Sequence, residues 1–232
     1  VGASITEHKE IPVISFTGGT TTGAQIAKVA APMFKKLSLE LGGKNPTLIF
    51  DDCNYDKMLK TVVRSSFANQ GQISLCGSRL LIQSSIYVKF KTDFVREVQK
   101  LKVGNPKSPD TNQGALVSKP HMEKVLDYIE IAKNEGGKIL CGGNQVDLSK
   151  EGLGGYFVEP TVIEGLDMSC RTNQEEIFGP VVTIMPFETE DEAVELSNAT
   201  SYGLAASVWT ENVSRTNRVA DQLHMGIVWV NC

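Results

Sequence analysis

The sequence predicts an α/β fold in which a mostly parallel sheet is flanked by helices. Short apolar runs of strand length alternate along the chain with amphipathic segments of helix length. The glycine-rich turn Thr17-Gly18-Gly19 joins the first apolar run to the first amphipathic segment, as expected where a strand leads into a helix. With 232 residues, of which 41% are hydrophobic and 22% charged, the chain has an ordinary globular composition.

The expected elements of the first third of the chain follow from local periodicity. Residues 12–16 form an apolar run of strand length, 36–41 alternate as in a strand, and 47–50 form another strand. Thr20 or Thr21 can cap a helix whose apolar face carries Ile26, Val29, Ala30, Met33 and Phe34. A second helix over 55–68 has the apolar stripe Met58, Leu59, Val62, Val63 and Phe67, and a loop over 69–78 follows it.

The rest of the chain continues the alternation. We expect strands at 80–82, 138–140, 157–163, 181–187, 205–209 and 227–231, and helices at 86–101, 118–135, 190–199 and 212–225. A glycine-rich loop over 142–155 separates two of these strands. The pattern contains no internal repeat, so it is typical of a large α/β domain rather than of a repeat protein.

Composition excludes several classes of function. The net charge of −4 argues against a nucleic-acid-binding surface, and no apolar run is long enough for a membrane span. The three histidines are isolated, so no metal site is expected. The five cysteines are odd in number and irregularly spaced, which favours reduced thiols and a cytoplasmic location.

Both ends of the sequence suggest an internal fragment of a longer protein. The chain begins at Val1 with neither an initiator methionine nor the basic and apolar regions of a signal peptide. It stops at Cys232, within a pattern typical of a strand.

Three segments contain residues that could bind a ligand or take part in catalysis. The residues alone do not decide between such a role and a purely structural one. At the Phe16–Gly23 junction, backbone N–H groups could approach a phosphate, although glycine-rich turns of this kind are common. Glu40 lies between two leucines, so its carboxylate is either exposed by strand alternation or buried at a cost. Residues 175–181, Glu-Glu-Ile-Phe-Gly-Pro-Val, form an acidic turn whose default interpretation is a solvated loop.

Taken together, these segments resemble motifs of the NAD(P)-dependent aldehyde dehydrogenase superfamily. The match extends over Phe16–Gly23, Leu39–Pro46, Phe67–Arg79 and Glu175–Val181, in the order and at the separations that the family shows. The resemblance implies oxidation of an aldehyde to a carboxylate with NAD or NADP through a covalent acyl-enzyme, in a homo-oligomer. Within the superfamily, residues 67–76 and 114–119 are most similar to 2-aminomuconic and hydroxymuconic semialdehyde dehydrogenases, so a semialdehyde is one candidate substrate.

The resemblance also assigns roles to individual residues. Glu40 corresponds to the general base that activates the hydrolytic water. The cofactor is expected at residues of the two flanking motifs, with Glu176 at the nicotinamide ribose and Phe178 near the ring; the full set is Gly18, Gly19, Gly23, Leu41, Gly42, Glu176 and Phe178. Residues 1–42 would be the C-terminal part of a dinucleotide-binding domain, and 43–232 a catalytic domain truncated at its C-terminus.

The chain departs from the family pattern at its most important position. Ser74 stands where the family has its nucleophilic cysteine. A hydroxyl is a much weaker acid than a thiol and needs a dedicated base, so we expect severe loss of turnover. Cys76 is a possible substitute nucleophile, and the alternative is that it is an inert buried thiol.

Two other functions compete with an active dehydrogenase. The first is a catalytically inactive descendant with a binding or structural role, as in lens crystallins derived from this family. The second is an esterase that uses Ser74, which would require a nearby base. None of the three histidines is close to Ser74 in sequence, so this alternative is disfavoured.

Overall fold

The structure, a computed structural model, describes all residues from 1 to 232. The chain divides into two compact units, Val1–Gly43 and Lys44–Cys232.

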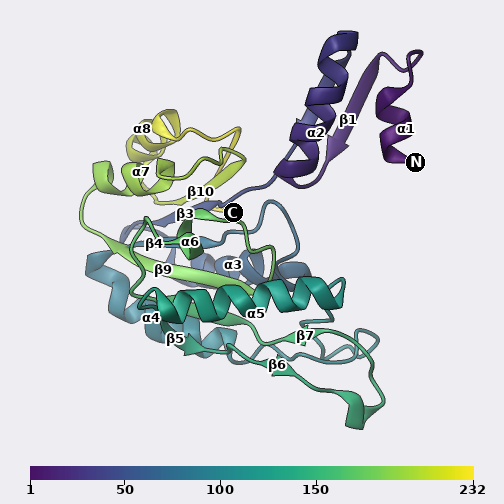
Figure 1. Ribbon diagram of the computed structural model, residues 1–232. Coiled ribbons are helices and arrows are strands. Elements are labelled where there is room, and N and C mark those ends of the chain that lie inside the picture. The colour runs from purple at the N-terminus through teal and green to yellow at the C-terminus, as the bar shows by residue number, and fades with distance from the viewer. The chain divides into compact units, whose positions relative to one another are not determined.

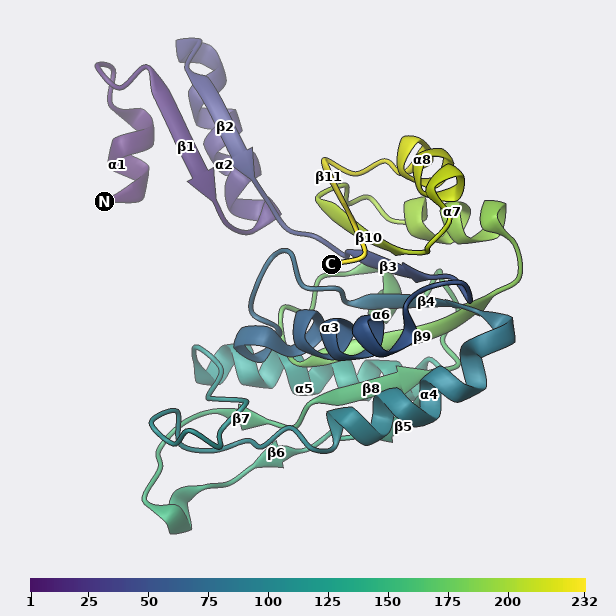
Figure 2. The same ribbon diagram turned by 180° about the vertical axis from the view of Figure 1, so that it is seen from behind.

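The smaller unit contains two parallel strands and their helices (Figure 2). Its elements are α1 (Gly2–Glu7), β1 (Val13–Thr17), α2 (Thr20–Ala30), the 3₁₀ turn η1 (Ala31–Met33) and β2 (Lys36–Glu40). The expected cap at Thr20 or Thr21 is wrong, because the helix begins one residue earlier and Gly19 is its N-cap. Both threonines therefore lie in the first turn of α2.

The larger unit is built on a seven-stranded sheet with the order β11-β10-β3-β4-β9-β8-β5 (Figures 1 and 2). The strands are β3 (Pro46–Ile49), β4 (Arg79–Gln83), β5 (Lys138–Cys141), β8 (Thr161–Glu164), β9 (Val181–Phe187), β10 (Ala205–Trp209) and β11 (Ile227–Val230). Every neighbouring pair is parallel except β5 with β8. The prediction of an α/β fold with a mostly parallel sheet is confirmed.

Helices cover both faces of this sheet. Leu80 and Ile82 of β4 pack in one core cluster with α3 (Tyr55–Phe67) and α4 (Ser84–Val98). Leu81, which points the other way, packs in a second cluster with α7 (Glu190–Asn198) and α8 (Val213–Gln222). A third cluster lies under α5 (Lys119–Asn134). Because these strands are buried on both faces of the sheet, their sequences are continuously apolar.

The strands around residue 160 differ from those expected from the sequence. The single strand expected at 157–163 is two strands: β7 (Phe157–Val158) pairs with β6 (Gln145–Val146), and β8 starts only at Thr161. Pro160 separates them, because proline has no N–H to donate to a strand ladder. The short helices α1, α6 (Arg171–Gln174) and η3 (Ser149–Glu151) were also not predicted, since periodicity is not detectable over so few residues.

None of the helices combines the length and the hydropathy needed to cross a bilayer. The five cysteines are all unpaired thiols. The cytoplasmic location and the oligomeric state of the whole protein stay predictions.

Candidate active site

Three of the segments singled out from the sequence lie at one edge of the large sheet. Asn45 directly precedes β3, Ser78 directly precedes β4, and Pro180 directly precedes β9. These three strands are parallel neighbours in the sheet, so their amino ends lie side by side. The 69–78 loop and the acidic segment, which we define as Glu175–Pro180, are thereby brought to the same place.

The 69–78 loop is held from below by Asn45. The Asn45 side-chain amide donates to the carbonyl of Ser74 at 2.7 Å and to the carbonyl of Cys76 at 2.9 Å. The Asn45 carbonyl accepts from the backbone N–H groups of Ser78 and Arg79 at 3.1 and 3.2 Å. The residue directly before β3 therefore fixes the backbone at Ser74, the expected nucleophile position.

The loop begins with three consecutive residues in the left-handed backbone region. The φ angles are 50° at Asn69, 57° at Gln70 and 69° at Gly71. Only glycine adopts this region freely; asparagine tolerates it, and glutamine is strained there. The chain thus turns sharply at the end of α3, before it reaches Ser74.

Glycine is required at position 71 by a close approach to the acidic segment. A Cβ atom at Gly71 would overlap the carbonyl oxygen of Gly179, and one at Gly179 would lie 2.6 Å from Cγ2 of Val125. The turn before Ser74 and the residue after Phe178 are therefore in direct backbone contact. The structure brings two of the resembling motifs together.

Ser74 is half-buried, and its contacts are made by its backbone. Cys76, two residues on, is only 9% exposed, and its thiol lies 3.8 Å from the Ala68 carbonyl. Burial raises the pKa of the Cys76 thiol to about 11. A reactive cysteine needs a lowered pKa, so these features favour the inert buried thiol.

Charged and aromatic side chains fix the acidic segment. Arg171 makes a two-pronged ion pair with Glu175, and the Tyr128 hydroxyl donates to the same carboxylate. These hydrogen bonds, that of Arg171 first, lower the pKa of Glu175 to about 2. Lys124 donates to the Glu176 carbonyl at 3.0 Å.

Phe178 adopts an unusual backbone conformation with φ of 60°. Its carbonyl lies 2.6 Å from the Nε2 atom of His121, and the two rings meet edge-on with centroids 6.0 Å apart. A bulky residue is rarely left-handed unless its surroundings hold it there. His121 supplies part of that restraint.

Two basic side chains of the larger unit, Lys44 and Arg79, are buried. Lys44 is 2% exposed and Arg79 is 1% exposed. Arg79 donates to the carbonyls of Lys44, Leu196 and Ser197 and to the sulfur of Met168. Burial, and secondarily the charge of Arg79, lowers the pKa of Lys44 to about 7, although Glu176 acts in the opposite direction.

In the smaller unit, the Phe16–Gly23 junction leads into an open helix N-terminus. Gly19 caps α2 without a side-chain hydrogen bond, and no atom lies within 4 Å of the place where its Cβ would be. Gly23 packs against Leu41, so closely that a Cβ there would overlap the Leu41 side chain. The first N–H groups of α2 have no partner within the helix, so they are available to an anionic group.

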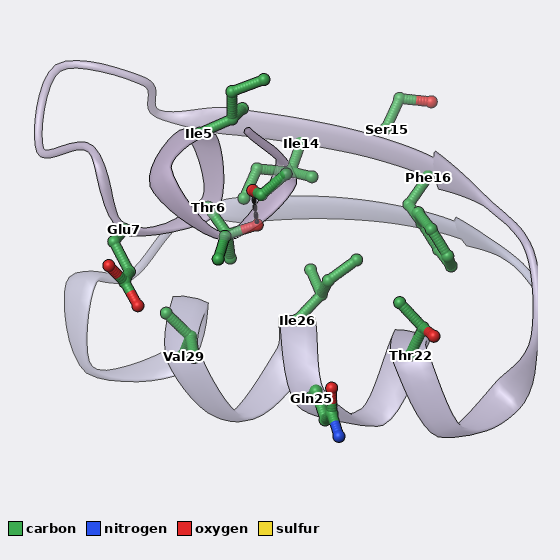
Figure 3. A pocket seen from close by; sticks show the side chains of 12 residues that line it. Ile5, Thr6, Glu7, Ile14, Ser15, Phe16, Thr22, Gln25, Ile26 and Val29 are labelled. Atoms are coloured by element: carbon green, nitrogen blue, oxygen red, sulfur yellow. Dashed lines mark hydrogen bonds between the residues drawn. The ribbon is translucent and has the colours of Figure 1, made fainter.

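A cavity of about 430 Å³ lies beside this junction, within the smaller unit. Its walls come from α1, β1 and α2, and Figure 3 shows Ile14, Phe16 and Ile26 among the side chains that line it. The lining is mostly apolar, which suits a flat ring better than a charged group.

Glu40 is the last residue of β2, and its side chain is exposed within the alternating pattern of that strand. Leu41 and Gly42 follow it and are half-buried. Glu40 belongs to the smaller unit and Ser74 to the larger one.

Several residues of this region were not predicted from the sequence to take part in the site. Lys44 lies within the motif that was recognised, but nothing in the pattern indicates that its ammonium group is buried. His121, Lys124 and Tyr128 share one face of α5, with spacings of three and four residues, and that periodicity is the signal that could have grouped them. No cluster of three or more potential metal ligands is present.

The chain is similar to known proteins over its whole length. The family model described as "Aldehyde dehydrogenase family" matches residues 1–232. The 2-aminomuconic semialdehyde dehydrogenases of Mus musculus and Homo sapiens are 49% and 50% identical to it, and the alignments cover 100% of this chain and 48% of each relative. A 2-hydroxymuconic semialdehyde dehydrogenase of Pseudomonas sp. (strain CF600) is 45% identical, over 99% of this chain and 47% of that protein.

A crystal structure of betaine aldehyde dehydrogenase from Staphylococcus aureus in complex with NAD⁺ superposes on the chain with a TM-score of 0.94 at 43% identity. The superposition covers 100% of this chain and 46% of that one. The chain therefore spans about half the length of the relatives that it matches.

Proposed function

Because the chain belongs to the aldehyde dehydrogenase family, we propose that the full-length protein is built to oxidise an aldehyde to a carboxylate with NAD(P). The observation that carries this proposal is the contact between the 69–78 loop and the acidic segment at Gly71 and Gly179. That contact brings Gly71, three residues before position 74, against the residue that follows Phe178, which supports the expected roles of Glu176 and Phe178 at the nicotinamide end of the cofactor. Residues 1–42 would complete the dinucleotide-binding domain, and 43–232 would form the catalytic domain.

The residues present fit a dinucleotide. The N-terminus of α2 at Gly19, with Gly18 and Gly23 beside it, suits a pyrophosphate, because no side chain caps it and the first N–H groups of a helix have no partner within the helix. The neighbouring apolar cavity is suited to the adenine ring. When bound, NAD(P) supplies the hydride acceptor. The similarity to a structure solved with NAD⁺ supports NAD as the cofactor to test first.

Position 74 would supply the nucleophile that adds to the carbonyl carbon and later carries the acyl group. Glu40 would take a proton from the water that hydrolyses this ester.

The oxidation is expected to be slow when the nucleophile is the hydroxyl of Ser74 instead of a thiolate. The structure provides no hydrogen-bonded base for its hydroxyl, whereas a thiolate needs none once formed. We therefore propose that the family reaction is severely impaired by this one residue. The substrate class that fits best is an unsaturated dicarboxylic semialdehyde, on the similarity to the 2-aminomuconic and 2-hydroxymuconic semialdehyde dehydrogenases.

The test is Ser74→Cys in the full-length protein. We expect kcat for NAD reduction with an aldehyde to rise roughly a thousandfold, which corresponds to about 4 kcal/mol of transition-state stabilisation. Ser214→Cys, on the exposed surface of α8, is the matched control and should change nothing. If the natural protein and its Ser74→Cys variant reduced NAD at comparable rates, position 74 would not be the nucleophile.

Ser74 itself favours a second candidate, a binding protein that has kept the fold and lost the reaction. In that case the full-length protein would bind NAD stoichiometrically, and Ser74→Cys would not restore turnover. The two candidates are separated by that single variant.

A further inference from the structure

Three glutamine side chains tie the 69–78 loop and the end of α3 to one distant segment, Gln113–Val117. The amide of Gln70 makes two bonds to it: its Oε1 accepts from the N–H of Gly114 at 3.0 Å, and its Nε2 donates to the carbonyl of Ala115 at 3.3 Å. The Gln70 amide thus pairs with one backbone N–H and one backbone carbonyl, as the main chain of a neighbouring strand does in a sheet.

The other two bonds lie on either side of this pair. Gln72 accepts from the N–H of Val117 at 3.0 Å. In the opposite direction, the buried side chain of Gln113 donates to the carbonyl of Phe67, the last residue of α3, at 2.9 Å. We call Gln70, Gln72 and Gln113 together the glutamine clamp. It fixes the chain from the end of α3 to two residues before Ser74.

The clamp acts where the backbone is strained. Asn69 and Gln70 are both left-handed without being glycine, a conformation that persists only when surrounding contacts hold it. Gln70 is at once the strained residue and the one whose side chain makes the paired bonds. The turn is also held by the packing of Gly71 on Gly179 and by two hydrogen bonds between Asn69 and Gln72, but these contacts lie within the loop or on Gly71 and do not reach the Gln113–Val117 segment.

Beyond the clamp, Asn45 holds the carbonyls of Ser74 and Cys76. Between the two anchors, Ile73 is 38% exposed and packs little. The direction of the side chain at position 74 is therefore set by two anchors, of which Asn45 lies within the recognised family motif and the clamp reaches across to a separate segment.

We propose that Gln70, supported by Gln72, is a positioning residue that sets the orientation of the side chain at position 74 through its amide bonds to Gly114 and Ala115. The importance of that orientation for catalysis rests on the proposed function. The clamp itself is a claim about the loop and can be tested without turnover.

The test is Gln70→Met in the full-length protein, because methionine keeps the length and shape of glutamine and removes both hydrogen-bonding groups. Gln145→Met, at an exposed position on β6, is the matched control. We expect amide hydrogen exchange in peptides covering 69–78 to accelerate roughly tenfold in Gln70→Met, the effect of about 1.4 kcal/mol of lost hydrogen bonding. Exchange in the core helix α3 should not change.

A second measurement uses the thiol introduced by Ser74→Cys. Its alkylation rate should change about tenfold when Gln70→Met is added, and kcat should fall while the KM for NAD is unchanged. Should Gln70→Met fail to fold, Gln72→Met removes the single bond to Val117 and should show the same changes, smaller in size. Exchange and alkylation rates equal to those of the Gln145→Met control would overturn the clamp.

Failure of the clamp and failure of the proposed function give different results. If Ser74→Cys restores no aldehyde oxidation but Gln70→Met still loosens 69–78, only the function is wrong. If Ser74→Cys restores oxidation and Gln70→Met alters neither exchange nor kcat, only the clamp is wrong.

Discussion

The 69–78 loop and the acidic segment meet at one edge of the sheet, yet they are held by opposite kinds of interaction. The loop is tied by neutral amide groups, those of Asn45, Gln70 and Gln72. Ionisable and aromatic side chains tie the acidic segment, and these are His121, Lys124, Tyr128 and Arg171. Each region nevertheless contains non-glycine residues with a left-handed backbone.

This difference indicates what each region needs. Neutral amides keep their hydrogen-bonding capacity at any pH at which the protein is folded, so the position of residue 74 does not depend on titration. Charged groups attract and repel over longer distances, and they suit a segment that is expected to receive a polar cofactor. The comparison predicts that the loop responds to changes in shape, and the acidic segment to changes in charge.

The largest effect is expected where the two regions touch. Gly71→Ala adds a Cβ that overlaps the Gly179 carbonyl and forces alanine to a φ of 69°. Overpacking and backbone strain together should destabilise the protein by about 4 kcal/mol. Gly152→Ala is the control: its φ is 73°, but no atom lies within 4 Å of the added Cβ, so only about 1 kcal/mol should be lost. Chemical denaturation measures both, and equal losses would show that the contact with Gly179 is not required.

A smaller effect, one that depends on pH, is expected at Lys44. Its pKa is about 7 in the folded protein, against 10.5 for an ordinary lysine. As the pH falls from 10.5 towards 7, the unfolded chain takes up a proton at this site and the folded chain does not. Folded stability is therefore lost across this window, and below pH 7 no further loss comes from Lys44.

The variant Lys44→Met removes this dependence while keeping an apolar side chain of similar length. Between pH 10 and pH 7, the protein with Lys44 should lose about 3 kcal/mol of stability relative to Lys44→Met, and the other titrating groups cancel in the difference. Denaturation midpoints of both proteins at several pH values give the measurement. Parallel curves for the two proteins would mean that Lys44 is charged in the folded state.

The arrangement of the fold was largely predictable from the sequence, because both-face burial gives parallel strands a distinctive apolar composition. Residues 181–187 and 205–209 were predicted with the bounds that the structure has. The effect of Pro160 on the expected strand at 157–163 was not foreseen. It divides that strand into two, and the first part, β7, pairs with β6. Caps were the weakest inference, as at Gly19, since several adjacent residues could begin α2.

The site was predictable only as far as its motifs. The motifs at 39–46, 67–79 and 175–181 were recognised, but residues 44–46, 67–79 and 175–181 converge because of the strand order β3-β4-β9, which no local pattern encodes. The clamp shows the same limit, because Gln70 and Gly114 are 44 residues apart in sequence. The roles of Glu40, Ser74 and the cofactor residues stay proposals, and Glu40 lies in the other compact unit.

The smallest effect that sharpens the comparison concerns His121. Its Nε2 atom and the Phe178 carbonyl, 2.6 Å apart, form the one side-chain hydrogen bond to the strained residue of the acidic segment. His121→Leu removes the bond and should cost about 1 kcal/mol, the usual net contribution of one hydrogen bond. His121→Gln offers an amide donor at a similar distance along the side chain and should recover most of that loss.

Stability alone does not separate a positioning role from a packing role for His121, so cofactor affinity is the second measurement. If the His121 bond maintains the left-handed Phe178, His121→Leu should weaken NAD binding several-fold in titration calorimetry while His121→Gln does not. Hydrogen exchange in 69–78 should be unaffected by either variant, because that loop is held by its own amides. Acceleration there by His121→Leu would mean that the two regions are not held independently, and the contrast between them would fail.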